Sequence, residues 1–213
     1  MRHAGAIMIR KLFPSFLYEA TLRNSNLKSF NSDLAEEAYR IRDTDDNGRA
    51  WSAKNYPDGY TSYGSMDALH RFSSTFEALE KAIDRHVTEY VRSLEMEIKP
   101  SALKMTSCWV NIMSQNVTHS GHIHPLSVVS GTYYVTTPPK GGSLKFEDPR
   151  LGFFMASPPR KMNAKIDNRR FFEIHPKAGQ VVLFESWMRH EVPPNQDKRD
   201  RISVSFNYDW VGR

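Results

Sequence analysis

Two histidines separated by one residue, His122 and His124, are the first candidates for chemistry in this sequence. In an extended strand, residues i and i+2 point to the same side, so both imidazoles can reach one ion without backbone distortion. A third histidine, His190, follows a later strand-like run. Any one of these residues alone would be read as a core histidine with a hydrogen-bond partner. Together they favour a metal site, and neutral imidazoles suit Fe, Zn, Cu and Ni.

Arg201 opens another strand-like run, Arg-Ile-Ser-Val-Ser-Phe-Asn, in which apolar and polar residues alternate. The face with Ile202 and Val204 should pack in the core, and the face with Arg201 and Ser203 should line a cavity. Buried polar groups need partners, and arginine binds a carboxylate through two parallel hydrogen bonds. This face is therefore suited to hold a dicarboxylate near the metal.

The second half of the chain should supply the strands that position these residues. From residue 104 the hydrophobic period is two, and turn signals such as 176–179 separate the runs. Several short strands favour a sandwich or a barrel. A segment at 149–169, rich in Pro, Arg and Asn, is long enough to act as a lid. We expect strands at 104–114, 121–125, 128–136, 142–147, 170–175, 180–185 and 201–208.

The first half reads as a support for this core. Apolar spacing predicts a helix over 27–42, capped by Ser29 or by Asp33, and a clearer helix that starts with the capping box Ser74-Thr-Phe-Glu77. Two other segments complete this half: a short strand at 7–13, stopped by a proline, and a long loop at 43–70 rich in Asp, Gly, Ser, Asn and Tyr.

The composition describes a globular protein in a reducing compartment. The chain has 213 residues, with 39% hydrophobic and 25% charged, so we expect one domain (1–213), with 1–103 supporting a core at 104–210. The net charge of +5 is mild, and without a recognition motif nucleic-acid binding is not expected. The single cysteine, Cys108, fits the cytoplasm. No apolar run reaches the length of a membrane span.

The order of motifs in the second half resembles one enzyme superfamily. It is similar to the 2-oxoglutarate/Fe(II)-dependent dioxygenases, and within their prolyl-hydroxylase-like branch to the bacterial and phage "putative 2OG-Fe(II) oxygenase" family. The resemblance covers roughly residues 104–210. The motifs are His122-x-His124, Ser130-Gly-Thr-Tyr-Tyr134, Gly141-Gly-Ser-Leu144, Pro176-Lys-Ala-Gly179, Trp187-Met-Arg-His190 and Arg201-Ile-Ser203.

The resemblance implies a mainly β fold with flanking helices, namely a double-stranded β-helix (a cupin-like jelly roll) with the metal at one mouth. It implies that His122, His124 and His190 bind Fe(II) and form the catalytic centre. The usual facial triad has two histidines and one carboxylate, and here His124 stands where the carboxylate would. Two departures from a plain three-histidine centre stay open: a carboxylate from Glu147 or Asp148, and His119 as a fourth ligand or a neighbour of the ligands.

For the cosubstrate, the resemblance implies that Arg201 binds the far carboxylate of 2-oxoglutarate. Ser203 and Tyr134 would assist, and Asn111 would line the same cavity. The implied activity is hydroxylation of a small-molecule or peptide substrate with O2, with decarboxylation of 2-oxoglutarate to succinate. The identity of the substrate and the oligomeric state, including a homodimer, stay open.

Two other functions compete with this one. A cupin-like iron dioxygenase with three histidines would need no 2-oxoglutarate, and a metal-binding module would show no turnover at all. The pair Arg201 and Ser203 favours the 2-oxoglutarate enzyme, whereas the histidine at position 124 favours the cosubstrate-free dioxygenase. Consumption of 2-oxoglutarate separates the three.

Overall fold

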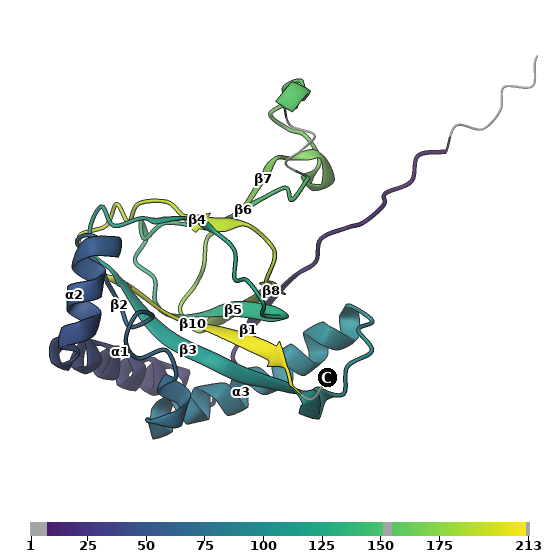
Figure 1. Ribbon diagram of the computed structural model, residues 1–213. Helices are drawn as coiled ribbons and strands as arrows, with labels where there is room; N and C mark the ends of the chain where they lie inside the picture. The colour runs from purple at the N-terminus through teal and green to yellow at the C-terminus, as the bar shows by residue number, and fades with distance from the viewer. Residues whose placement is uncertain (1–7, 151–154, 212–213) are drawn as a thin grey trace, which may run out of the picture.

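Two antiparallel sheets face each other in the computed structural model, which describes residues 8–150 and 155–211 (Figure 1). The six-stranded sheet has the order β1-β8-β5-β10-β3-β2, and the four-stranded sheet has the order β4-β9-β6-β7. The strands are β1 Leu17–Thr21, β2 Tyr60–Thr61, β3 Leu103–Met113, β4 His119–His122, β5 Val129–Thr136, β6 Leu144–Glu147, β7 Phe171–Ile174, β8 Gln180–Glu185, β9 His190–Val192 and β10 Arg201–Trp210.

All seven strands predicted beyond residue 104 are present, with ends displaced by at most three residues. The strand β9 has only three residues, too few to show a period of two. The strand predicted at 7–13 is wrong over its described part, because residues 8–13 form no strand and the first strand is β1. Pairing with β8 decides this: β1 completes the edge of the six-stranded sheet, from Leu17↔Phe184 to Thr21↔Gln180.

The alternation predicted for β10 is confirmed, and it separates two cores. On one face Ile202, Val204 and Phe206 pack between the sheet and the helices. The opposite face of the same sheet looks toward the four-stranded sheet, where Tyr134, Phe146 and Phe184 belong to a second apolar cluster. Arg201 and Ser203 are buried on this inner side. The period-two pattern therefore assigns the polar residues of β10 to the interior of the jelly roll.

Two long helices, α1 (Leu27–Thr44) and α3 (Ser74–Ser93), lie along the outer face of the six-stranded sheet (Figure 1). Their buried residues recur every three or four positions, as an apolar stripe on a helix requires. The predicted caps are wrong. The helix α1 already begins at Leu27, so neither proposed residue caps it, and α3 is capped one residue earlier than expected, by the Ser73 hydroxyl.

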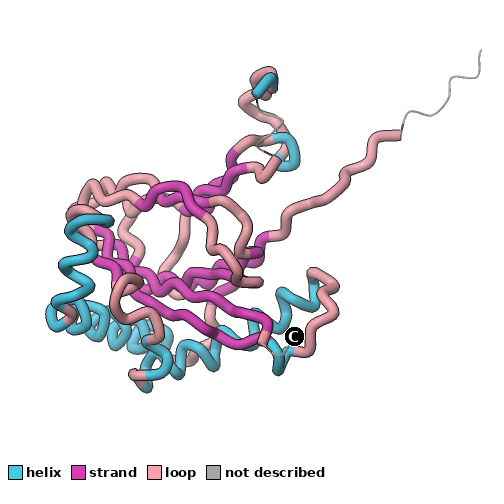
Figure 2. Tube along the Cα trace, viewed as in Figure 1, coloured by secondary structure: helices cyan, strands magenta, loops and turns pink. Residues whose placement is uncertain are grey.

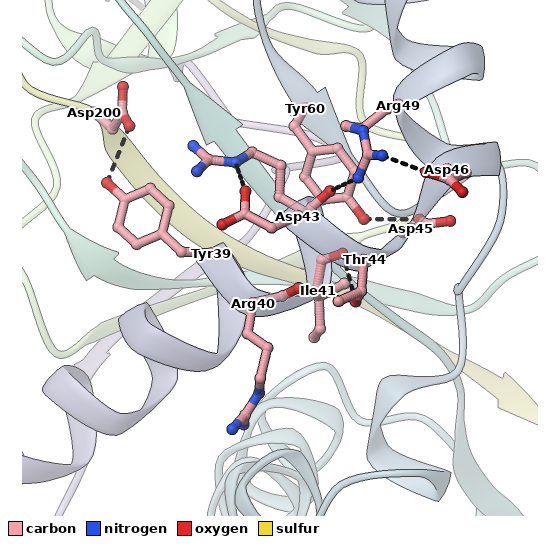
Figure 3. A network of polar contacts seen from close by, with 11 residues as sticks. Tyr39, Arg40, Ile41, Asp43, Thr44, Asp45, Asp46, Arg49, Tyr60 and Asp200 are labelled. Carbon is pink, nitrogen blue, oxygen red and sulfur yellow. Dashed lines mark hydrogen bonds and ion pairs between the residues drawn. The ribbon is translucent and has the colours of Figure 1, made fainter.

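Residues 43–70 do not form one long loop, because the helix α2 (Asp46–Asn55) fills the first half of the segment. Asp45 caps α2 by accepting a hydrogen bond from the Gly48 N–H at 2.9 Å. Its carboxylate also accepts a hydrogen bond from the Tyr60 hydroxyl at 2.8 Å (Figure 3). A further hydrogen bond comes from the Ser65 hydroxyl. One buried carboxylate thus ties the start of α2 to the chain around β2, a tertiary contact that composition does not reveal.

We predict that Asp45→Ala lowers the free energy of unfolding by about 1–3 kcal/mol, the typical cost of leaving buried donors unsatisfied. Burial raises the pKa of Asp45, but hydrogen bonds from Ser65, Gly48 and Tyr60 outweigh it and lower the pKa overall. Ionised Asp45 therefore contributes its full stabilisation above about pH 3.9, the pKa of aspartate in the unfolded chain. This stabilisation is lost as the pH falls through the lower pKa that Asp45 has in the folded protein. Urea unfolding of the wild type and of Asp45→Ala at pH 7 and pH 3 measures this stabilisation. The exposed neighbour substitution Asp46→Ala is the control, and equal stability of both variants would contradict the prediction.

Residues 155–170, which lead into β7, project away from the body of the protein (Figure 2). Residues 155–170 are almost all exposed, including the basic residues Arg160, Lys161, Lys165, Arg169 and Arg170. An ion pair joins Lys11 to Asp167. The remainder of the predicted lid, residues 151–154, lies outside the described residues. Whether this segment closes over a site stays a prediction. In the described part of the chain, no helix combines the length and apolar character needed to cross a membrane.

Candidate metal centre and neighbouring polar residues

The structure brings His122, His124 and His190 together where β4 pairs with β9. His122 and His190 are direct cross-strand partners. His124 lies two residues beyond His122, just past the end of β4. There its backbone N–H donates a hydrogen bond to the Ser186 carbonyl at 2.9 Å. The ring centroids of the three histidines are 4.3–5.2 Å apart, and one ligand nitrogen from each lies within 4.8 Å of the others. No other such group of His, Cys, Asp or Glu side chains occurs among the described residues.

Hydrogen bonds determine which nitrogen each imidazole offers. In all three rings Nδ1 lies beside an oxygen acceptor: the Ser120 carbonyl for His122 at 2.8 Å, the Met188 carbonyl for His190 at 2.9 Å, and Asn207 Oδ1 for His124 at 2.6 Å. These acceptors place the proton on Nδ1 and leave the lone pair on Nε2.

Two of these lone pairs face each other, since the Nε2 atoms of His122 and His124 are 3.3 Å apart. Two ligands at about 2.1 Å from one ion give a similar separation. The arrangement therefore fits a shared metal ion.

All three histidines are held in the neutral form that binds metal. Burial, with smaller effects of neighbouring charges, lowers the pKa of His124 to about 4 and the pKa of His190 well below its usual value. Burial also lowers the pKa of His122. No proton has to leave these rings near neutral pH before they coordinate a cation.

The alternative ligands do not join this group. Glu147 accepts hydrogen bonds from Arg170 and Arg189, and Asp148 accepts two from the Arg150 guanidinium. His119 stacks on His122, with centroids 4.4 Å apart and an interplanar angle of 15°, but it is not part of the converging set. The candidate ligands are therefore the three neutral imidazoles. His119 packs beside them without joining the group.

Three of the four predicted cosubstrate residues form one cross-strand row of the six-stranded sheet, and Arg201 lies two residues before this row on β10. Ser203 on β10 pairs with Asn111 on β3 and with Tyr134 on β5. Arg201 is 2% exposed, and its guanidinium lies 5.1 Å from the centre of the Tyr134 ring. Its Nη1 contacts only weak partners, the Met113 sulfur at 3.3 Å and the Ser203 hydroxyl at 3.4 Å. No acidic side chain forms an ion pair with Arg201 in the described part of the chain.

Several buried polar atoms around this row have no hydrogen-bond partner among residues 8–150 and 155–211. They are Arg201 Nε, the Tyr134 hydroxyl, Asn111 Oδ1 and the Tyr56 hydroxyl. Native proteins leave few buried polar groups unsatisfied, and those that remain call for an explanation such as a ligand. A polar molecule bound beside these atoms would supply the missing partners.

Two residues of this region were not predicted from the sequence. Tyr56 is buried beside the inner apolar cluster, and the charge of Arg201 partly offsets the rise in its pKa that burial causes. Asn207 accepts the hydrogen bond from His124. Asn207 shares the polar face of β10 with Arg201, because 201, 203, 205 and 207 alternate, so the same period-two argument could have identified it. Nothing in the sequence around Tyr56 places it near Arg201.

Comparison with known proteins adds a family and a fold. Residues 107–207 match the family described as "Putative 2OG-Fe(II) oxygenase". Similar solved structures include a prolyl-4-hydroxylase from Pseudomonas putida (15% identity, 93% of this chain and 94% of that chain covered, TM-score 0.59). Another is HygX from Streptomyces hygroscopicus with nickel and 2-oxoglutarate bound (14% identity, 92% and 83% covered, TM-score 0.61). The epimerase SnoN from nogalamycin biosynthesis is also similar (14% identity, 92% and 76% covered, TM-score 0.65). No curated protein sequence matches the chain.

At these identities the likeness to solved structures establishes the fold, and it confirms the predicted jelly roll. The family match adds the enzyme class, and its span includes the three histidines, Arg201 and Ser203. Residues 107–207, just under half of the chain, are therefore similar to the 2-oxoglutarate/Fe(II)-dependent oxygenases.

Proposed function

We propose that His122, His124 and His190 hold one Fe(II) ion, that Arg201 binds 2-oxoglutarate beside it, and that the enzyme hydroxylates an organic substrate with O2. One observation carries the proposal. Three histidine nitrogens with free lone pairs converge. On the inner face of the same jelly roll lies the buried Arg201 guanidinium, which has no acidic partner among the described residues. The three imidazole nitrogens can bind a cation, and the buried guanidinium needs an anionic partner such as a carboxylate.

The contacts of Arg201 indicate how the cosubstrate is held. A carboxylate would replace the weak contacts with Met113 and Ser203 by a two-pronged pair that also satisfies Nε. The Tyr134 hydroxyl, which has no partner within the described chain, would add a hydrogen bond. The three ligands are neutral, so a dianionic cosubstrate would meet no repulsion from them.

Bound Fe(II) would supply O2 activation coupled to decarboxylation of 2-oxoglutarate, with one oxygen atom going to succinate and the other to the substrate. The chain's own contribution is orientation. His122 and His190 are fixed by their backbone acceptors, and Arg201 fixes the far end of the cosubstrate. Positioning of this kind accounts for a large share of enzymatic rate enhancement.

The substrate in this proposal is a small molecule or a peptide. Solved structures of similar fold contain both kinds, hygromycin B in HygX and a peptide fragment in a prolyl hydroxylase from Trichoplax adhaerens. We propose that the exposed segment around 155–169 helps to select the substrate as a lid. We also propose a cytoplasmic location, because the only cysteine, Cys108, is a buried free thiol.

We expect the iron-loaded protein to convert 2-oxoglutarate to succinate only when O2 is present, and faster with its substrate than without. The measurement is release of labelled CO2 from 2-oxoglutarate carrying the label at C1, screened against pooled metabolites and peptides. Reactions without iron and without O2 are the controls. O2 consumption without loss of 2-oxoglutarate would favour the cosubstrate-free dioxygenase, and metal binding without any turnover would favour a binding module.

A further inference from the structure

We propose that Asn207 is a positioning residue that keeps His124 in its metal-binding orientation, supported by the buried hydroxyls of Ser130 and Ser186. This inference rests on the proposed function, because it assigns a role within the same metal centre. It concerns the one ligand that stands where the usual triad has a carboxylate.

The three histidines differ in what orients them. The acceptors for His122 and His190 are backbone carbonyls two residues earlier in the chain, at Ser120 and Met188. The acceptor for His124 is the side chain of Asn207, 83 residues away on β10. A change of side chain can therefore remove the orientation of His124, whereas it cannot remove the carbonyl acceptors of the other two ligands.

A buried hydroxyl chain holds Asn207 in place. The Ser130 hydroxyl donates to Asn207 Oδ1 at 2.8 Å and lies 2.7 Å from the Ser186 hydroxyl. Ser130 and Ser186 are completely or almost completely buried, and Ser130 is the register partner of Asn207 on β5. The Ser186 carbonyl also accepts the His124 N–H at 2.9 Å. The backbone and the ring of His124 are thus held by two ends of one network.

The orientation of the Asn207 amide decides whether His124 can bind a metal. With Oδ1 toward the ring, the imidazole proton stays on Nδ1 and Nε2 keeps its lone pair. With the NH₂ group toward the ring, Nδ1 would have to accept, the proton would move to Nε2, and coordination would be blocked. An aspartate at position 207 has no donor when ionised, so it could present only the binding orientation. Partners of this kind typically change metal affinity by about 10- to 100-fold.

The test is Ni²⁺ affinity of the full-length protein, measured by calorimetry for the wild type and the variants at position 207. We expect Asn207→Ala to weaken Ni²⁺ binding by about 10- to 100-fold and Asn207→Asp to restore it to within a few-fold of the wild type. Asn207→Leu, close to asparagine in volume, repeats the loss in case the alanine variant folds poorly. Asn195→Ala is the matched control, because Asn195 is a fully buried asparagine whose side chain hydrogen-bonds to backbone groups of Met113, Asp197 and Arg199 and to none of the three histidines. We expect it to lower thermal stability and to leave Ni²⁺ affinity unchanged.

A spectroscopic measurement separates positioning from a general loss of structure. In the Co²⁺-loaded protein, Asn207→Asp should shift the visible ligand-field bands, because a charged partner makes the His124 ring a stronger donor. Asn195→Ala should leave the bands unchanged. Wild-type Ni²⁺ affinity in a folded Asn207→Leu protein would overturn the inference while leaving the proposed function intact. A wild-type protein that binds neither Ni²⁺ nor Fe²⁺ would instead overturn the proposed function itself.

Discussion

Replacing any one of His122, His124 or His190 by alanine is expected to lower Fe(II) affinity by more than about 100-fold and to abolish 2-oxoglutarate turnover. Loss of a ligand should exceed the 10- to 100-fold effect of losing a neighbour that merely orients one. The fold should survive, because in the absence of metal the facing nitrogens of His122 and His124 contribute no favourable hydrogen bond to each other. The measurements are iron stoichiometry after anaerobic loading and circular dichroism on the same samples.

The matched control for these variants is His119→Ala. His119 stacks on His122 within the same buried cluster, but its nitrogens do not join the converging set. We expect this variant to retain one iron per chain. Full iron content in His124→Ala would point to a carboxylate ligand such as Asp148, and loss of iron from His119→Ala alone would show that the ligand set is wrong.

The convergence of the three histidines could be predicted because it depends on short-range rules. The pair His122 and His124 needs only the period of an extended chain, and His190 needs only a neighbouring strand. The same rule separated Arg201 and Ser203 from Ile202 and Val204, and the structure places these two sets on opposite sides of the sheet. Where a two-residue period determines which face a side chain occupies, sequence suffices to place it.

The errors arise where long-range contacts decide the local structure. The helix α2 lies in a segment whose Asp, Asn and Gly content favours turns; it is stabilised by Asp45, which reaches Tyr60 and Ser65. The first strand lies at β1 because β8 offers it an edge. The role of Asn207 depends on the pairing of β10 with β5 and on His124, 83 residues away. None of these contacts is visible in the local pattern.

Arg201→Ala is expected to weaken 2-oxoglutarate binding by tens- to thousands-fold while leaving metal affinity unchanged. Loss of one partner of a buried, hydrogen-bonded charge pair typically costs about 2–5 kcal/mol. Arg201→Lys should also weaken binding, because an ammonium keeps the charge but not the two parallel hydrogen bonds. The measurement is 2-oxoglutarate affinity by calorimetry on Ni²⁺-loaded protein, at equal metal occupancy in every variant. Arg199→Ala is the control, since that arginine lies two residues earlier, is exposed and pairs with Asp197.

A second variant, Arg201→Met, tests whether Arg201 serves to bind 2-oxoglutarate and does not stabilise the ligand-free fold. In the described chain Arg201 is buried with only weak partners, and a buried charge without a counter-charge is costly. Methionine fills much of the same volume without that cost, so the ligand-free variant should be at least as stable as the wild type. The wild type should gain thermal stability from 2-oxoglutarate by mass action, and Arg201→Met should gain none. An unchanged dissociation constant in both Arg201→Ala and Arg201→Met would remove the main argument for 2-oxoglutarate and favour a three-histidine dioxygenase that uses no cosubstrate.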